Sequence, residues 1–219
     1  MTSEPLSFNF LGQTLLLLPE KAIFWKEERI LIIADIHLGK VGHFRKAGIG
    51  IPKQMEQDDL ALISDLIHEY NPAKIIFLGD LFHSDMNNDW DWLVMWRSMF
   101  KKIEMILVLG NHDILNNKFY IDLNFELHDT LNVGPFLFSH EPLKTKALVE
   151  NVAYVICGHI HPGVTLKGSA RQMLTLPCFH FGAKQAIIPA FGKFTGKVCV
   201  KNIKGDKVFA VVKNKVISF

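Results

Sequence analysis

Side chains that can bind metal ions recur in five short clusters, each placed directly after an apolar run of the sequence. The clusters are Asp35 and His37; Gly79, Asp80 and His83; Gly110, Asn111, His112 and Asp113; His140; and Gly158, His159 and His161. Carboxylate, amide and imidazole ligands without a thiolate suit manganese, iron or zinc and suit calcium poorly. Each cluster alone has an ordinary explanation as a turn or a satisfied polar group. Five in succession predict a metal site.

The candidate ligands outnumber those that one small ion takes from a protein. They are Asp35, His37, Asp80, Asn111, His140, His159 and His161. Two ions about 3.5 to 4 Å apart that share one carboxylate use such a set, and they lower the pKa of a bridging water from about 16 towards 7. The resulting hydroxide can attack the phosphorus of a phosphate ester. The set therefore predicts two-metal phosphoester hydrolysis.

The apolar runs before these clusters are typical of buried β-strands. They are residues 30–34, 74–78, 103–109, 136–138 and 153–157. Strands that alternate with helices form parallel sheets through right-handed crossovers, and ligands gather at the carboxyl ends of such strands. We therefore expect five neighbouring strands to bring the five clusters to one edge of a sheet.

Helices are predicted between the first three strands. The first has apolar residues spaced by three or four, Leu60, Ile63, Ile67 and Tyr70, and the second has Trp92, Trp96 and Met99. Asn71-Pro72 should end the first helix. From Val164 onward, β-prone stretches at residues 173–176, 197–200 and 208–212 are separated by Gly, Pro or Lys-rich turns. They predict a second, more antiparallel sheet.

In this order, the clusters resemble the signatures of the calcineurin-like metallophosphoesterases. The matching segments are Asp35-Ile36-His37, Gly79-Asp80, Gly110-Asn111-His112-Asp113, Ser139-His140 and Gly158-His159-Ile160-His161. The resemblance implies an α/β fold, a four-layer αββα sandwich with two central mixed β-sheets. It also implies that each ion takes three ligands and shares Asp80 with the other ion. The first three are Asp35, His37 and His161, and the second three are Asn111, His140 and His159.

Three further residues are candidates for catalysis. His112 stands next to a ligand and is placed to donate to a phosphoryl or leaving oxygen, with Asp113 orienting its ring. The alternative is that this pair only stabilises its loop. His83 completes a motif that resembles the form found in nucleases of the superfamily, where the histidine assists diester cleavage. It can equally orient a metal ligand.

Further segments resemble the bacterial ligase-associated DNA damage response endonucleases over nearly the whole chain. They are residues 38–52, 79–84, 139–142 and 189–196. The resemblance implies a phosphodiesterase that prefers Mn²⁺, with Zn²⁺ or Fe²⁺ as alternatives. It implies that the substrate is DNA, single-stranded or flexible, and that the enzyme functions in repair beside a DNA ligase, a helicase and an exonuclease.

The segment after the first cluster is basic. Its cations Lys40, Arg45 and Lys46 are placed to contact phosphates that flank the scissile one. Phe44 either stacks a base or anchors its own segment. Farther along, residues 162–219 hold ten lysine or arginine residues and one acid. That asymmetry indicates either a surface for a polyanion or a solvated lysine-rich face.

Length and composition indicate one globular domain over residues 1–219, since 49% of the 219 residues are hydrophobic. Three widely separated cysteines give no disulfide framework, which favours a reducing, cytoplasmic setting. The first ten residues lack a basic signal-peptide region, and we expect no membrane association.

Two other functions remain open. The same metal pair could act on nucleotides, cyclic nucleotides, phosphoproteins or other small phosphoesters. Alternatively, the chain could be a metal-binding scaffold that has lost catalysis.

Overall fold

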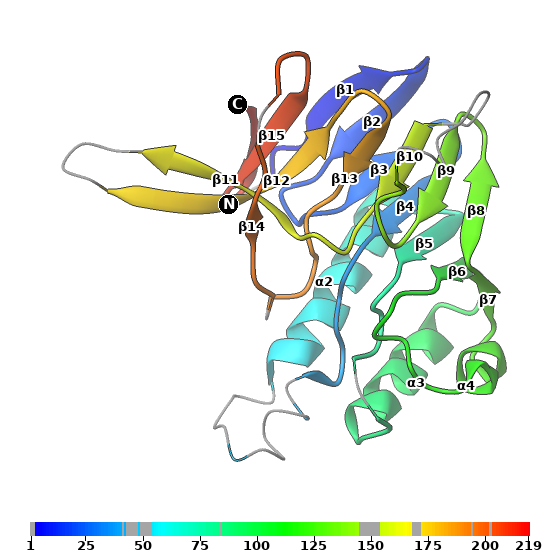
Figure 1. The fold of residues 1–219 in the computed structure, drawn as a ribbon. Coiled ribbons are helices and arrows are strands. Elements are labelled where there is room, and N and C mark those ends of the chain that lie inside the picture. Colours follow the sequence, from blue (N-terminus) through cyan, green and yellow to red (C-terminus); the bar gives the residue numbers. More distant parts are fainter. Residues whose placement is uncertain are drawn as a thin grey trace.

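The protein is built from two packed β-sheets and a layer of helices (Figure 1). The computed structural model describes residues 3–40, 42, 48, 54–83, 85–144, 154–167, 172–193, 195–201 and 203–219. Among these residues, none of the helices has the length and apolar character that a bilayer-spanning segment requires.

The first sheet contains seven strands in chain order. They are β1 (Leu6–Phe10), β2 (Gln13–Leu17), β3 (Ile23–Trp25), β4 (Ile30–Ile33), β5 (Lys74–Leu78), β6 (Glu104–Val108) and β7 (Phe125–His128). Strands β4 to β7 are parallel, as the sequence predicts for the strands before the first three clusters. Strands β1 to β4 form an antiparallel meander that sequence analysis did not predict. Its first hairpin turns at Leu11 and Gly12, whose positive φ angles of 51° and 75° fit a tight primed turn.

The second sheet is mixed and contains the C-terminal strands. Its order is β14 (Val198–Cys199), β11 (Pro162–Lys167), β12 (Met173–Phe181), β13 (Gln185–Ile187), β10 (Tyr154–Cys157), β9 (Phe136–Ser139) and β8 (Thr130–Val133). Strand β15 (Lys207–Val212) pairs with β12 and with β16 (Lys215–Ser218). The three predicted C-terminal stretches all contain strand residues, and most of their pairings are antiparallel.

The five strands before the ligand clusters do not lie in one sheet, so that expectation is wrong. Strands β4, β5 and β6 belong to the first sheet, whereas β9 and β10 are a parallel pair in the second. The clusters still converge because the two sheets pack face to face. A run of three or four apolar residues shows that a strand is buried and does not show in which sheet it lies.

Alternation along the central strands explains the layers. Ile30 and Ile32 of β4 face the second sheet, whereas Leu31 and Ile33 face the helices. Strands β5 and β6 alternate in the same way, so both faces of the parallel region are buried and the strands read as continuous apolar runs. The core between the sheets also contains Phe138 of β9.

Three described helices cover the outer face of the first sheet: α2 (Gln54–Tyr70), α3 (Asp89–Met99) and α4 (Asn117–Asp122). Helix α2 ends directly before Asn71-Pro72, as predicted. Helix α3 is also confirmed, but it packs through Trp90, Leu93 and Trp96. Trp92 and Met99, which marked this helix in the sequence, are exposed. The fold class is confirmed as α/β with two central mixed sheets.

Removal of the Phe138 ring should destabilise the contact between the sheets. Phe138 is fully buried, and truncation of a buried Phe to Ala costs about 3 to 5 kcal/mol. Phe138→Ala should therefore lower the free energy of unfolding by that amount in urea denaturation followed by circular dichroism. Phe219→Ala, at a residue 48% exposed, is the control and should change it by less than about 0.5 kcal/mol. Equal losses in the two variants would contradict this core assignment.

Candidate metal centre

The structure brings the seven predicted ligands together where the five strands end. Six of them form two groups, each with its ligand atoms within 4.8 Å of one another: Asp35, His37 and His161, and Asp80, His140 and His159. The Oδ1 atom of Asn111 lies 3.0 Å from Nε2 of His140 and so joins the second group. These groups are two candidate metal-binding sites.

The groups meet at Asp80. Its Oδ2 atom lies 3.7 Å from Nε2 of His37, in the first group, and 3.5 Å from Nε2 of His140, in the second. Within the first group, Nε2 of His161 lies 3.4 Å from Oδ1 of Asp35 and 3.4 Å from Nε2 of His37. One carboxylate oxygen is thus placed between two sets of ligand atoms, which is the arrangement that a shared ligand requires.

The backbone turns sharply where it delivers these ligands. Five of them have left-handed φ angles between 50° and 67°: Asp35, His37, Asp80, His159 and His161. This conformation is uncommon for non-glycine residues and costs on the order of 1 to 3 kcal/mol each when the surroundings enforce it. Hydrogen bonds between the loops enforce it here, because the N–H of His37 donates to the Asp80 carbonyl at 2.8 Å and the N–H of His159 donates to Oδ2 of Asp35 at 2.9 Å.

Two glycines allow the loops to approach closely. Gly79 has φ +74°, and a Cβ atom there would collide with the imidazole of His140. At Gly158, a Cβ atom would lie 2.5 Å from Oδ2 of Asp35. The glycines noted in the sequence before Asp80 and His159 therefore leave space for ligands that come from other strands.

Hydrogen bonds and burial keep the imidazoles available as ligands. Nδ1 of His140 lies 2.9 Å from the Leu78 carbonyl, so it carries the proton and leaves the Nε2 lone pair directed at the centre. Burial, followed by the positive charge of Lys40, lowers the pKa of His37 to about 2. His37 is therefore neutral at pH 7. The role of the Leu78 carbonyl could not be found from sequence, since every residue has one.

His83 lies beside a ligand. Its Nδ1 is 3.1 Å from Nδ1 of His37, the ring nitrogen opposite the one that faces the centre. This contact is the one that the orienting interpretation requires, and the role of His83 in diester cleavage stays a prediction. The His83 ring also lies 4.1 Å from that of His112, centroid to centroid, so the two candidate catalytic histidines are adjacent. The two interpretations of His83 are compatible.

Asp113 has other partners than the His112 ring, and the expectation that it orients this ring is wrong. Its Oδ2 accepts from the N–H groups of Asp80 and Gly110, and its Oδ1 accepts from the N–H of Phe82 and the hydroxyl of Tyr120. Burial raises the pKa of Asp113 to about 6, and the backbone N–H donors oppose that shift. A carboxylate with both oxygens occupied in this way fixes the ligand-bearing loops.

His112 is held by its backbone. Its N–H donates to Oδ1 of Asp80 at 2.9 Å, which leaves Oδ2 of that carboxylate for the centre. Its ring centroid lies 5.6 Å from that of His37. The ring therefore borders the centre. Because the side chain is half-buried, it also remains reachable from solvent.

Lys40 is the one predicted substrate-binding residue that the structure describes. Burial lowers its pKa, and the Asp80 carboxylate acts in the opposite direction. Lys40 also lowers the pKa of His37, so its charge acts on two of the candidate ligands, His37 and Asp80. The predictions for Phe44, Arg45 and Lys46 fall outside the described residues.

The donor set fits divalent cations. Asp35 is fully buried and Asp80 is 2% exposed, and in the described part of the chain neither forms an ion pair with a lysine or arginine. The described basic side chains within 4.0 Å of these carboxylates are histidines, which bind metal ions in their neutral form. Buried carboxylates need compensating positive charge. Metal ions held between the carboxylate oxygens and the imidazole nitrogens would supply it.

Comparison with known protein families agrees with this geometry. Residues 28–163 match the calcineurin-like phosphoesterase family, which is more than half of the sequence and includes all seven ligands. The chain belongs to this family. It is a metal-dependent phosphoesterase with two candidate metal-binding sites. No curated protein matches the sequence.

Two solved structures can be compared with this phosphoesterase. The nuclease MPE of Pseudomonas putida superposes with a TM-score of 0.83 at 27% identity, over 99% of this chain and 100% of that chain. Yfce, a phosphoesterase from E. coli, matches at 12% identity and a TM-score of 0.46, over 86% of this chain and 96% of that chain. The first match extends beyond the family region into the C-terminal strands.

Substitutions at the centre should separate the two sites. His161→Ala should remove one bound ion and His159→Ala the other. Asp80→Ala should weaken the binding of both ions, because Oδ2 of Asp80 lies within 3.7 Å of a histidine Nε2 in each group. The loss of affinity should exceed the roughly 10- to 100-fold that loss of a residue hydrogen-bonded to a ligand costs. Isothermal titration with Mn²⁺ measures the number of sites.

The matched control is His68→Ala, at an exposed residue on α2. It should bind as many ions as the wild type does. Two ions bound with unchanged affinity by Asp80→Ala would contradict the shared-ligand assignment.

Proposed function

We propose that this phosphoesterase is a two-metal phosphodiesterase that cuts DNA in DNA repair. The observation that carries the proposal is the single Asp80 oxygen between two groups of ligands, at 3.7 Å and 3.5 Å from a histidine of each. Two ions held in this arrangement would supply a water of lowered pKa as nucleophile and would neutralise charge on the phosphate. Asp35, His37, His161 and Asp80 would hold one ion, and Asn111, His140, His159 and Asp80 the other.

His112 and His83 supply the proton chemistry beside this centre. The half-buried His112 ring is placed to donate a hydrogen bond to a phosphoryl oxygen or to the leaving oxygen. His83 holds the His37 ring through Nδ1 and stacks near His112, so it positions one ligand and one donor together. Asp113 contributes by fixing the backbone of both loops.

Three observations support a DNA diester as substrate. The Pseudomonas putida protein, similar over nearly the whole chain, is a nuclease. Lys40 adds positive charge next to the metal ligands, where a phosphate neighbouring the scissile one would lie. The segments at residues 38–52 and 189–196 resemble those of ligase-associated DNA damage response endonucleases. That resemblance also favours single-stranded or flexible DNA and a function beside a DNA ligase, a helicase and an exonuclease.

Mn²⁺ is the metal that we propose, with Zn²⁺ or Fe²⁺ as alternatives for the same oxygen and imidazole donors. We further propose that the enzyme acts in the cytoplasm. Cys157, Cys178 and Cys199 are free thiols, which suits a reducing compartment.

Two substitutions should separate metal binding from chemistry. Asp80→Ala should abolish turnover and lower the affinity for both metal ions. His112→Ala should keep both ions and lower kcat by about 10²- to 10⁴-fold, the usual contribution of a positioned proton donor. Metal content and turnover of bis(p-nitrophenyl) phosphate, measured on the same preparations, test this. Wild-type turnover in either variant would refute these roles.

Substrate class is tested by metal-stripped protein supplied with Mn²⁺, Zn²⁺ or Mg²⁺ in turn. Single-stranded DNA, double-stranded DNA, bis(p-nitrophenyl) phosphate, a phosphomonoester and a cyclic nucleotide are the substrates, and Asp80→Ala is the control. Cleavage of DNA that disappears in the control supports the proposal. Turnover confined to monoesters or nucleotides would instead assign the enzyme to small phosphoesters.

A further inference from the structure

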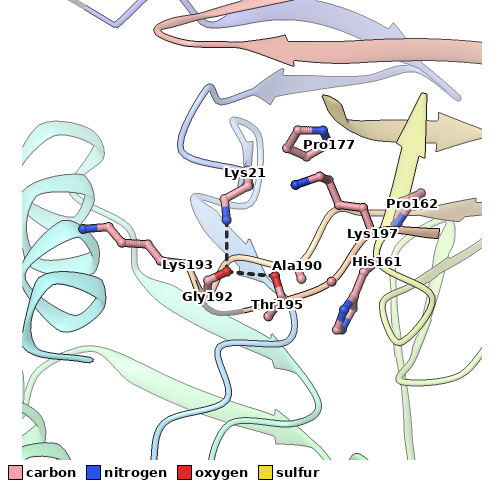
Figure 2. Close-up of a pocket in the computed structure, with 10 residues that line it drawn as sticks. Lys21, His161, Pro162, Pro177, Ala190, Gly192, Lys193, Thr195 and Lys197 are labelled. Carbon is pink, nitrogen blue, oxygen red and sulfur yellow. Dashed lines mark hydrogen bonds between the residues drawn. The ribbon is translucent and has the colours of Figure 1, made fainter. Parts of the chain in front are cut away.

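A small basic cavity adjoins the metal centre. It has a volume of about 60 Å³. Ten residues line it, among them Lys21, His161, Pro177, Lys193, Thr195 and Lys197. Figure 2 shows these side chains around the loop that contains Gly192. His161 belongs both to this cavity and to the first candidate metal site. None of the lining residues is acidic.

The loop that contains Gly192 lines the cavity and is hydrogen-bonded to the backbone beside the metal centre. The N–H of Phe191 donates to the Ala34 carbonyl at 2.8 Å, and that of Gly192 donates to the Asp35 carbonyl at 3.2 Å. A Cβ atom at Gly192 would collide with the Ile36 carbonyl, so only glycine permits this approach. The position of the cavity is therefore fixed relative to the ligand Asp35.

Lys21 is anchored beside this loop. Its Nζ donates to the Phe191 carbonyl at 2.5 Å. It also donates to the Gly192 carbonyl at 3.3 Å (Figure 2). An ammonium group has three donors, so one remains after these two bonds. Burial lowers the pKa of Lys21 to about 8, and the positive charges of Lys197 and Lys193 act in the same direction. An anion in the cavity would offset both effects.

The other charges nearby leave the cavity positive. Lys193 extends away from it towards α2 and forms an ion pair of 2.9 Å with Asp58 (Figure 2). Asp59 raises the pKa of Lys21 but does not line the cavity, and its Oδ2 accepts from the backbone N–H of Lys193. Lys197 is exposed and extends over the cavity on the side of Lys21.

We propose that Lys21 and Lys197 form a subsite for a phosphate adjacent to the scissile one in a nucleic-acid strand. The inference rests on the proposed nuclease function and specifies how the substrate is held. The cavity has room for a few waters or one oxyanion, since a cavity needs about 10 to 15 Å³ of such volume to hold one water. A polynucleotide carries a second phosphate one nucleotide from the cleaved bond, and a simple phosphoester does not.

Oligonucleotide binding measured in the presence of a metal chelator tests the subsite without turnover. Affinity for a short fluorescein-labelled oligothymidylate is measured by fluorescence anisotropy at several salt concentrations. Lys197→Gln should weaken binding about 10-fold at low salt and reduce the slope of log affinity against log salt by about one, as expected for one lost phosphate contact. Lys204→Gln is the charge-matched control and should bind like the wild type, because Lys204 is exposed on a turn and does not line the cavity.

Substrates with and without a flanking phosphate test the position of the subsite. With Mn²⁺, the wild type should cleave either pTpT or TpTp about 10-fold more efficiently, in kcat/KM, than TpT. Lys197→Gln should lose most of this preference, and Lys204→Gln should keep it. Lys21→Met should behave like Lys197→Gln, and thermal melting establishes that each variant is folded.

Several results would overturn the subsite. They are wild-type binding by Lys197→Gln, a loss no larger than that of Lys204→Gln, an unchanged salt slope, or no binding by the wild type at low salt. Failure of the proposed function is a separate result, in which the wild type binds the oligonucleotide but does not cleave it with any of the metals.

Discussion

Burial of two carboxylates between imidazoles is the constraint on which the structure around the centre depends. Asp35 and Asp80 lie out of contact with water, where an uncompensated negative charge is costly. Neutral histidines cannot compensate it, but cations held by the same groups can. The oxygens that do not face the centre accept backbone N–H groups instead, as Oδ1 of Asp80 does from His112. The loops thus surround the negative charge of Asp35 and Asp80 with hydrogen-bond donors and metal-binding groups.

The two sheets set the geometry of these loops. Register aligns the ends of neighbouring strands: Ile33 of β4 is opposite Phe77 of β5, and Cys157 of β10 is opposite Ser139 of β9. The alternating apolar faces of β4, β5 and β6 then hold the first sheet against the second. Residues that follow the strands of different sheets therefore reach the same volume, at the cost of left-handed backbone at five ligands.

Positive charge borders the centre at more than one place. Lys40 lies near Asp80 and His37, and Lys21 and Lys197 line the cavity that shares His161 with the first metal site. Under the proposed function, a substrate with several phosphates would use these places together, whereas a small ester would occupy the metal centre alone. Through Phe191 and Gly192, the segment before β14 links the C-terminal strands, which lie largely beyond the family match, to the backbone of the candidate ligand Asp35.

The sequence by itself determined the chemistry, because metal-ligating residue types after five apolar runs identify donors without any knowledge of the sheets. It also determined the central strands and α2, whose patterns are local. Only the tertiary structure decided that β9 and β10 belong to the second sheet, since a buried run reads the same in either sheet. Only the tertiary structure likewise showed that Asp113 accepts backbone N–H groups. It also showed that Lys21 and Lys197, 176 positions apart in the sequence, line the same cavity. Such contacts join residues that are distant in sequence, and no local pattern encodes them.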